Sequence, residues 1–163
     1  MKKSAVSKKG AGTWNLTPYK ILLPLMVFAG GCASYSEPVY LYDVYNEYSQ
    51  RLDVKDYDYI MDEALSSSMN NRGLDDPDQF RDYYPVLSEL PGLLKEKTTH
   101  YELSDGYRGC LTLNGFDRLE RPAVIKMEFK REQSSWKLDY VSVDYVDSPV
   151  KFVETAVCPK RRA

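Results

Sequence analysis

The spacing of hydrophobic residues changes once along the chain, and this change limits the folds open to it. From residue 39 to residue 94, hydrophobic side chains recur every three or four positions, which is typical of amphipathic helices. From residue 98 onward they alternate with polar side chains, which is typical of strands with one buried face. Helices followed by a run of strands indicate an α+β domain. We therefore expect N-terminal helices packed on one face of a curved antiparallel sheet.

The expected helices begin at a capping residue or at a proline. They cover residues 39–52, 57–65, 77–84 and 86–90. Asp56 is the expected N-cap of the second helix, and Asp76, which precedes Pro77, is that of the third. The serines and asparagines of residues 66–73 predict a loop.

The expected strands are rich in β-branched and aromatic residues. They cover residues 98–103, 107–113, 125–130, 136–145 and 150–157. Turns are expected at residues 104–106, at Asn114–Gly115 and at residues 132–134.

Two of these strands carry further information. Ile125, Met127 and Phe129 alternate with charged residues, so we expect one face of that strand to be buried and the other to be solvated. In the next strand the even-numbered residues around Leu138 are hydrophobic, whereas from Val141 the odd-numbered ones are. A change of parity within one strand predicts a β-bulge or a sharp bend, as curved sheets have.

The distribution of charge argues against a nucleic-acid partner. The chain has 22 Lys and Arg against 24 Asp and Glu, but residues 1–31 contain five of the lysines and no acidic residue. Without that segment, 17 basic residues stand against 24 acidic ones, a net charge of −7. Nucleic acids require clustered cations, which this acidic body lacks. The chain also contains no apolar run of about 18 residues, so we expect no permanent transmembrane helix.

The N-terminus has the layout of a secretory signal peptide. A basic, polar start is followed by the short apolar run of residues 21–28, which Pro24 interrupts. The small residues 29–31 then precede Cys32. A positive start, a short apolar core and small residues at the cleavage point together predict export.

The residues that end in Cys32 resemble the lipobox of bacterial lipoproteins. Gly30 and Gly31 match the small residues of that motif, whereas Ala29 stands where the family usually has Leu. The resemblance implies cleavage before Cys32 and an N-acyl diglyceride anchor on it, with fatty acyl chains such as palmitate. Ala33 stands where an Asp would retain the protein in the inner membrane. The resemblance therefore implies the inner leaflet of the outer membrane, facing the periplasm.

Two or three acyl chains anchor a domain stably, because each buried CH₂ contributes about 0.8 kcal/mol. The expected organisation is a signal peptide at residues 1–31, a lipidated cysteine with a short tether at residues 32–38, and a single globular domain at residues 39–163.

The remaining two cysteines predict a disulfide. With Cys32 assigned to lipid, Cys110 and Cys158 are left as a pair in an oxidising compartment. Two cysteines at this distance supply too few ligands for a metal site, and no Cys-x-x-Cys motif indicates redox chemistry. We expect a structural bond and neither a metal nor a cofactor.

The order of elements from residue 39 to residue 157, with the strand at 136–140 after a tight turn, resembles the NTF2-like fold; a different curved α+β domain is the alternative. The resemblance implies a cone-shaped domain, whose enzymes place an Asp or His as general base at the mouth of an apolar pocket. His100 is the one histidine that could take this role. We interpret it as a half-exposed strand residue, because geometry rather than presence makes a base. No catalytic motif is found, and no catalytic residue is assigned.

Two acidic clusters, at residues 53–63 and 75–82, suggest either a calcium site or carboxylates that complement helix dipoles. The spacing required for an EF-hand fails, so we favour the second interpretation.

Tyrosines near the anchor form a candidate binding surface. Tyr35, Tyr40 and Tyr42 lie close to the tether, and tyrosine suits both protein interfaces and lipid headgroups. The alternative is ordinary exposed and core residues. The cations of residues 160–162 predict a solvated tail, with contact to anionic headgroups or peptidoglycan as the alternative.

Two function hypotheses follow. The first is a non-catalytic, lipid-anchored envelope protein that binds a protein partner or a small apolar ligand at the periplasmic face of the outer membrane. The alternative is an NTF2-like pocket enzyme of the hydratase or isomerase type. The lack of an acid–base constellation favours the first. A pocket with Asp or His beside Tyr would favour the second.

Overall fold

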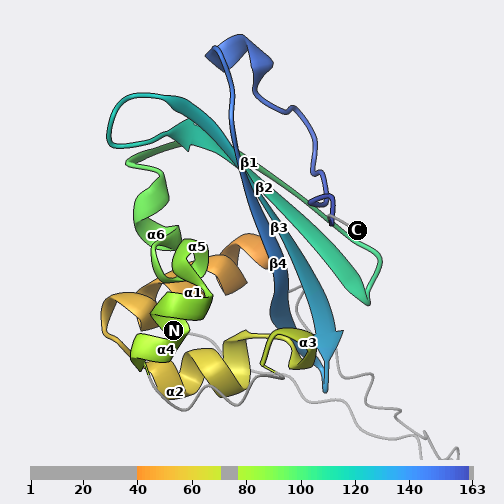
Figure 1. Ribbon diagram of the computed structural model, residues 1–163. Helices are drawn as coiled ribbons and strands as arrows, with labels where there is room; N and C mark the ends of the chain where they lie inside the picture. The colour runs from red at the N-terminus through yellow and green to blue at the C-terminus, as the bar shows by residue number, and fades with distance from the viewer. Residues whose placement is uncertain (1–39, 71–76, 162–163) are drawn as a thin grey trace, which may run out of the picture. The chain divides into compact units, whose positions relative to one another are not determined.

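The structure is a computed structural model that describes residues 40–70 and 77–161 (Figure 1). The expected signal peptide, Cys32, Tyr35 and the expected cap Asp76 lie outside the described residues. Along the described chain, α-helices come first and four antiparallel strands follow, so the predicted α+β class is confirmed. No helix of these residues is long and apolar enough to cross a membrane. The resemblance to the NTF2-like fold stays a prediction.

The helices are short apart from the first. They are α1 (Leu41–Asp53), α2 (Tyr57–Tyr59), the π-helix η1 (Ile60–Ala64), α3 (Ser67–Asn70), α4 (Pro77–Tyr83), α5 (Pro85–Ser88) and α6 (Leu90–Leu93). The Asp56 cap is confirmed, because its side chain accepts a hydrogen bond from the backbone N–H of Tyr59 at 3.3 Å. The single helix predicted for residues 57–65 is instead one α-turn that widens into a π-helix.

The loop predicted for residues 66–73 is wrong over Ser67–Asn70, which form α3. The Ser66 N–H donates to the carbonyl oxygen of Leu138 at 2.9 Å, while the Ser66 carbonyl accepts from Met69 and Asn70. This helical turn is therefore anchored on a strand that is distant in sequence, which local composition does not reveal.

The sheet is a meander of four strands. They are β1 (Glu96–Ser104), β2 (Arg108–Phe116), β3 (Pro122–Glu132) and β4 (Ser135–Tyr145), in the order β1-β2-β3-β4. Figure 1 shows the sheet strongly twisted, with the helices on one side and the chain after β4 returning along the other.

The change of hydrophobic parity in β4 marks a β-bulge, as predicted. Glu128 of β3 lies opposite Tyr140, and Phe129 lies opposite Leu138, so Asp139 has no partner on β3. The extra residue switches the inward positions of β4 from Leu138 before the bulge to odd-numbered residues after it.

The turn predicted at Asn114–Gly115 is wrong, because both residues lie inside β2. Asn114 is buried, and its side chain hydrogen-bonds Thr99 and Val153 instead of closing a turn. Gly115 faces a bulge in β1, where a Cβ would lie 2.1 Å from the carbonyl oxygen of Glu96. Glycine is required here for close approach of two backbones.

The strand predicted for residues 150–157 is also wrong. After the short 3-10 helix η2 (Pro149–Lys151), residues 152–161, the C-terminal segment, form no regular structure. Val157 exchanges hydrogen bonds with the Thr112 hydroxyl, as Val153 does with the Asn114 side chain. The segment crosses a face of the sheet rather than joining an edge, so its backbone pairs with side chains and no ladder forms.

The predicted disulfide is present and holds this segment in place. It joins Cys110 of β2 to Cys158, with Cα atoms 5.0 Å apart. The face of β3 that was expected to be solvated is therefore partly covered: Glu128 is buried, whereas the Lys126 and Lys130 side chains keep part of their exposure. The expectation is wrong at Glu128, because the covering segment comes from the end of the chain and shows no strand pattern.

The hydrophobic core lies between the helices and the other face of the sheet. Alternate strand residues such as Leu111, Ile125 and Phe129 pack there against side chains of α1 and α4, including Tyr45 and Phe80. The Tyr48 hydroxyl is buried and donates to the carbonyl oxygen of Leu87 at 2.9 Å. This hydrogen bond offsets the cost of removing the hydroxyl from water and links α1 to α5.

Candidate functional site

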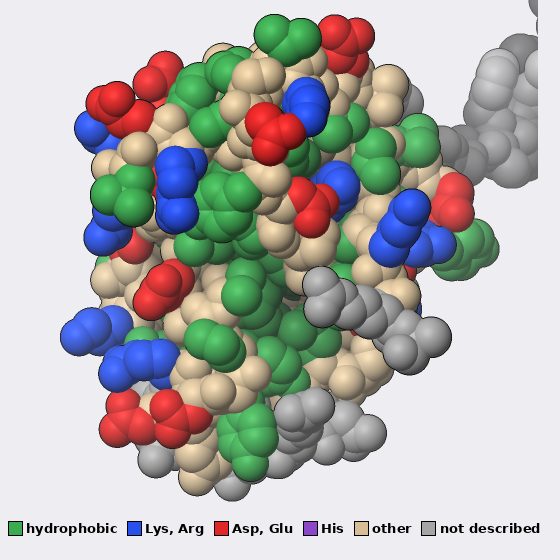
Figure 2. All heavy atoms as spheres, turned by 45° about the horizontal axis from the view of Figure 1, so that its top comes forward, with side chains coloured by type: hydrophobic (Ala, Val, Ile, Leu, Met, Phe, Trp, Pro, Cys, Tyr) green, Lys and Arg blue, Asp and Glu red, His purple; other side chains and the backbone are tan. Residues whose placement is uncertain are grey.

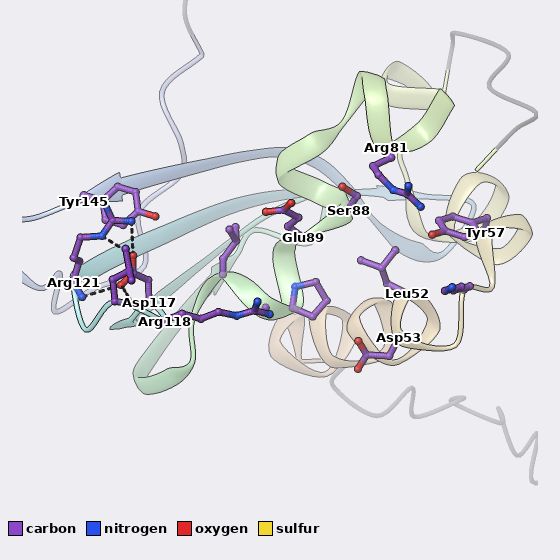
Figure 3. A pocket seen from close by; sticks show the side chains of 15 residues that line it. Leu52, Asp53, Tyr57, Arg81, Ser88, Glu89, Asp117, Arg118, Arg121 and Tyr145 are labelled. Atoms are coloured by element: carbon purple, nitrogen blue, oxygen red, sulfur yellow. Dashed lines mark hydrogen bonds and ion pairs between the residues drawn. The ribbon is translucent and has the colours of Figure 1, made fainter. Parts of the chain in front are cut away.

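An open groove of about 630 Å³ runs between the β2–β3 turn and the helices. Its walls come from the end of α1 and the turn after it, from α4 to α6, and from residues 117–121 between β2 and β3. Figure 3 shows these side chains facing one another from opposite sides. The groove exists because α1 and β2 both end here.

Asp117 orders the strand-side wall of the groove. One carboxylate oxygen accepts from the N–H groups of Leu119 (2.9 Å) and Arg121 (2.8 Å), and the other accepts from the Arg121 side chain (Figure 3). The Arg121 guanidinium also lies 4.5 Å from the centre of the Tyr145 ring. Burial raises the pKa of Asp117, but these hydrogen bonds outweigh it and hold that pKa below the ordinary value. Asp117 is thus an ionised turn residue rather than a general base.

Four other charged side chains of the groove stand without partners. Among the described residues, none forms an ion pair or a side-chain hydrogen bond with Asp53, Lys55, Glu89 or Arg118. Figure 3 shows Arg118 reaching from the β2–β3 turn along the groove toward the helices. Gly92 makes room for it, since a Cβ at that position would lie 3.0 Å from the guanidinium.

Apolar side chains lie between these charges. Leu52, Pro91 and Leu93 line the helix side, and Leu119 lines the turn, where it is 72% exposed. Figure 2 brings this end of the sheet toward the viewer and shows hydrophobic side chains in the middle, with basic and acidic ones interspersed around them. Apolar walls with unpaired charges of both signs suit a polypeptide segment better than a purely apolar or purely ionic ligand.

The groove contains no activated nucleophile. The hydroxyl of Ser88 donates to the carbonyl oxygen of Pro85 at 2.9 Å, and no base contacts it within the described residues. His100, the candidate general base of the enzyme hypothesis, lies outside the groove. Its ring is exposed and stacks on Tyr42, with centroids 4.0 Å apart and planes 5° apart. The structure does not bring these groups together.

The tyrosines proposed as a binding surface have separate environments. Tyr42 is held against β1 by the stacked His100 and by its own N–H, which donates to Glu102 at 3.0 Å. Tyr40 is 56% exposed at the start of α1. Tyr35 and the lipid site Cys32 lie outside the described residues.

A buried ionic cluster occupies the opposite end of the sheet. The Asp139 carboxylate, fully buried in the bulge, accepts hydrogen bonds from Ser66 (2.5 Å), Ser68 and Arg161, and pairs with Lys130 at 3.0 Å. Burial raises the pKa of Asp139, but these four partners outweigh it and lower that pKa to about 2.

Lys160 and Arg161 are exposed, as predicted for a solvated tail, but Arg161 also forms ion pairs that the prediction did not include. Besides Asp139, its guanidinium lies 3.4 Å from a carboxylate oxygen of the buried Glu128. The disulfide brings Arg161 to these carboxylates, and buried carboxylates require cationic partners. The cluster thus holds the end of the C-terminal segment against the sheet.

The described members of the two acidic clusters do not converge on one point, and Asp75 and Asp76 lie outside the described residues. Within residues 40–70 and 77–161, no group of three or more His, Cys, Asp or Glu side chains is arranged to hold a metal ion. Asp56 caps α2 and pairs with Arg51 at 2.8 Å, so this carboxylate has a local structural role.

No protein-family model and no curated protein sequence matches the chain. Sequence patterns did not single out Lys55, Glu89 or Arg118. The one sequence feature that could have indicated the groove was Leu119, an apolar residue within a polar turn.

Proposed function

We propose that this protein is a non-catalytic, lipid-anchored envelope protein that binds a segment of a partner protein in the groove. The observation that carries the binding role is the set of unpaired Asp53, Lys55, Glu89 and Arg118 on apolar walls. Unpaired charges of both signs select a partner with complementary charges, and the apolar walls supply the affinity.

The lipid anchor at Cys32 and the outer-membrane location are proposed from the sequence. The resemblance of residues 29–32 to a lipobox supports them, and the predicted disulfide agrees with an oxidising compartment. A peptide ligand is favoured over a small apolar one, because the groove is open and lined by charged side chains.

The test is photo-crosslinking in intact cells. A benzophenone amino acid replaces Leu119 in the groove or, as control, Val150, which is 94% exposed and outside the groove. We expect a discrete protein adduct from position 119 that position 150 does not give.

The same adduct should fall about tenfold or more when Arg118→Glu reverses one groove charge, because close like charges replace attraction by repulsion. Arg81→Glu provides a matched control, since Arg81 lines the groove but pairs with Asp78 at 3.6 Å. It should reduce the adduct less. An adduct from position 119 that Arg118→Glu leaves unchanged would contradict the proposed site.

A further inference from the structure

Three of the nine exposed large hydrophobic side chains of the described residues lie at the end of the domain where the described chain begins. Tyr40 is 56% exposed, Leu103 is 66% exposed and Tyr107 is 83% exposed. Leu103 lies near the end of β1, and Tyr107 lies in the β1–β2 turn of residues 105–107. This turn follows the last pair of the ladder, Ser104 and Gly109.

Contacts of α1 place Tyr40 at the same end. A Cβ on Gly109 would lie 2.6 Å from the side chain of Leu41, the first residue of α1. The N–H of Tyr42 also donates to Glu102, near the end of β1. Tyr40 immediately precedes Leu41, so it lies beside the β1–β2 turn.

An unpaired cation of the described residues lies beside Tyr107. Arg131 of β3 is exposed, its N–H donates to the carbonyl oxygen of Tyr107 at 2.8 Å, and the described residues offer its guanidinium no ion pair. Gly106, Tyr107, Arg131 and Ser134 line a shallow hollow of about 420 Å³.

The acidic side chains of this end are engaged in local hydrogen bonds. Asp105 accepts from the N–H groups of Tyr107 and Arg108, and these bonds hold its pKa below the ordinary value. Glu132 accepts from the N–H and hydroxyl of Ser67.

The chain that leads to this end is short. Seven residues lie between Cys32 and Tyr40, and the eight steps from one to the other span at most about 3.6 Å each in an extended chain, or roughly 29 Å in all. A lipid on Cys32 would therefore keep the start of α1 within about 29 Å of the bilayer.

We propose that Tyr40, Leu103, Tyr107 and Arg131 form a membrane-docking surface that rests on the lipid headgroups around the anchor. This inference rests on the proposed lipid anchor. Tyrosine rings and a leucine side chain enter the interfacial layer, where an apolar body and a polar tip are both accommodated, and the Arg131 guanidinium pairs with lipid phosphate.

Docking in this way would orient the groove away from the membrane. β2 runs from the docking surface at Arg108 to the groove at Phe116, and eight steps of about 3.3 Å separate the two residues by about 26 Å. The anchored domain would thus present its groove to the periplasm.

The test uses the full chain, processed in cells, purified and reconstituted in vesicles of phosphatidylethanolamine and phosphatidylglycerol. A benzophenone amino acid replaces Tyr107, which is 83% exposed, or, as controls, Leu119 and Val150, which are 72% and 94% exposed and lie away from the docking surface. We expect at least about tenfold more lipid adduct from position 107 than from either control. Arg131→Glu should reduce that adduct several-fold.

Equal lipid adducts at positions 107, 119 and 150 would overturn the docking surface, as would a protein adduct in place of lipid at position 107 in intact cells. Mass spectrometry of the N-terminal peptide reports the anchor separately. An unlipidated Cys32 with selective lipid adducts at 107 would contradict the anchor and support the docking surface. A lipidated Cys32 with equal lipid adducts at the three positions would support the anchor and contradict the docking surface.

Discussion

Asp139 shows how one residue can connect distant parts of a chain. As the extra residue of the β4 bulge it turns inward, where Ser66, Ser68, Lys130 and Arg161 surround its carboxylate. These partners come from α3, β3 and the C-terminal segment. Removing the carboxylate would take away the anionic partner of Lys130 and Arg161 and one of the two hydrogen-bond partners of the buried Ser66 hydroxyl, the other being Ser68.

We predict that Asp139→Asn lowers the free energy of unfolding by about 1–3 kcal/mol at neutral pH and makes this free energy depend less on pH in the acid range. The folded pKa of Asp139 is depressed from 3.8 to about 2, so its contribution to stability is complete above the unfolded pKa. That contribution is lost as the pH falls from about 3.8 toward about 2. The free energy of urea unfolding, measured across this range, checks both effects. Asp147→Asn, at an exposed carboxylate, should behave like wild type.

A second prediction concerns Gly115. Gly115→Ala should lower the free energy of unfolding by about 1–3 kcal/mol, because its Cβ would collide with backbone of β1. At Gly92 a new Cβ meets only the flexible end of Arg118, so Gly92→Ala should stay within about 0.5 kcal/mol of wild type. Similar destabilisation of the two variants would show that the β1 bulge relaxes to accommodate a side chain.

At the scale of elements, the C-terminal segment stabilises the domain although it has no regular secondary structure. Its backbone forms hydrogen bonds with the side chains of Thr112 and Asn114, and a disulfide joins it to β2. Its last described residue, Arg161, lies beside the buried carboxylates. It covers the second face of an antiparallel sheet, which otherwise would face water.

Loss of the disulfide should therefore cost stability. Replacing Cys110 and Cys158 by Ala should lower the free energy of unfolding by about 2–5 kcal/mol, because a 48-residue separation constrains the unfolded chain strongly. Urea unfolding with and without reductant measures this, and the double variant should be insensitive to reductant. Wild-type protein whose midpoint does not respond to complete reduction would disprove the expected contribution.

At the scale of the whole molecule, the two ends of α1 would serve different roles under our proposals. Its start lies at the docking surface, and its last residues, Leu52 and Asp53, line the groove. A helix of 13 residues is about 20 Å long, so one rigid element would link the membrane side to the binding side.

The anchor is tested by Cys32→Ala. We expect an uncut precursor without acyl mass, since the thiol that receives the lipid is missing; mass spectrometry and membrane fractionation measure the two effects. The Cys110→Ala variant is the control and should remain lipidated. Purified wild-type protein with a free N-terminus and no lipid would refute the anchor.

The sequence by itself determined features that depend on local physics. The 3–4 spacing placed α1, runs of β-forming residues placed β1 and most of β2, and alternation placed β3. Asp56 marked a cap, and a change of parity marked the bulge of β4. The cysteine count predicted the one disulfide of the described residues. Each of these follows from the period of side chains along a single element or from a small set of reactive residues.

Tertiary structure decided what depends on distant partners. Asn114 and Gly115 have the composition of a turn, yet burial of an amide with two partners and a close backbone contact keep them inside a strand. The C-terminal segment crosses the sheet because side chains of β2 replace a ladder. The groove residues Lys55, Glu89 and Arg118 come from three separate segments, and no spacing along the chain encodes their approach. These three residues meet because the helices bury their apolar faces against the sheet. This packing leaves the polar ends of the helices and the polar β2–β3 turn at the same end of the domain.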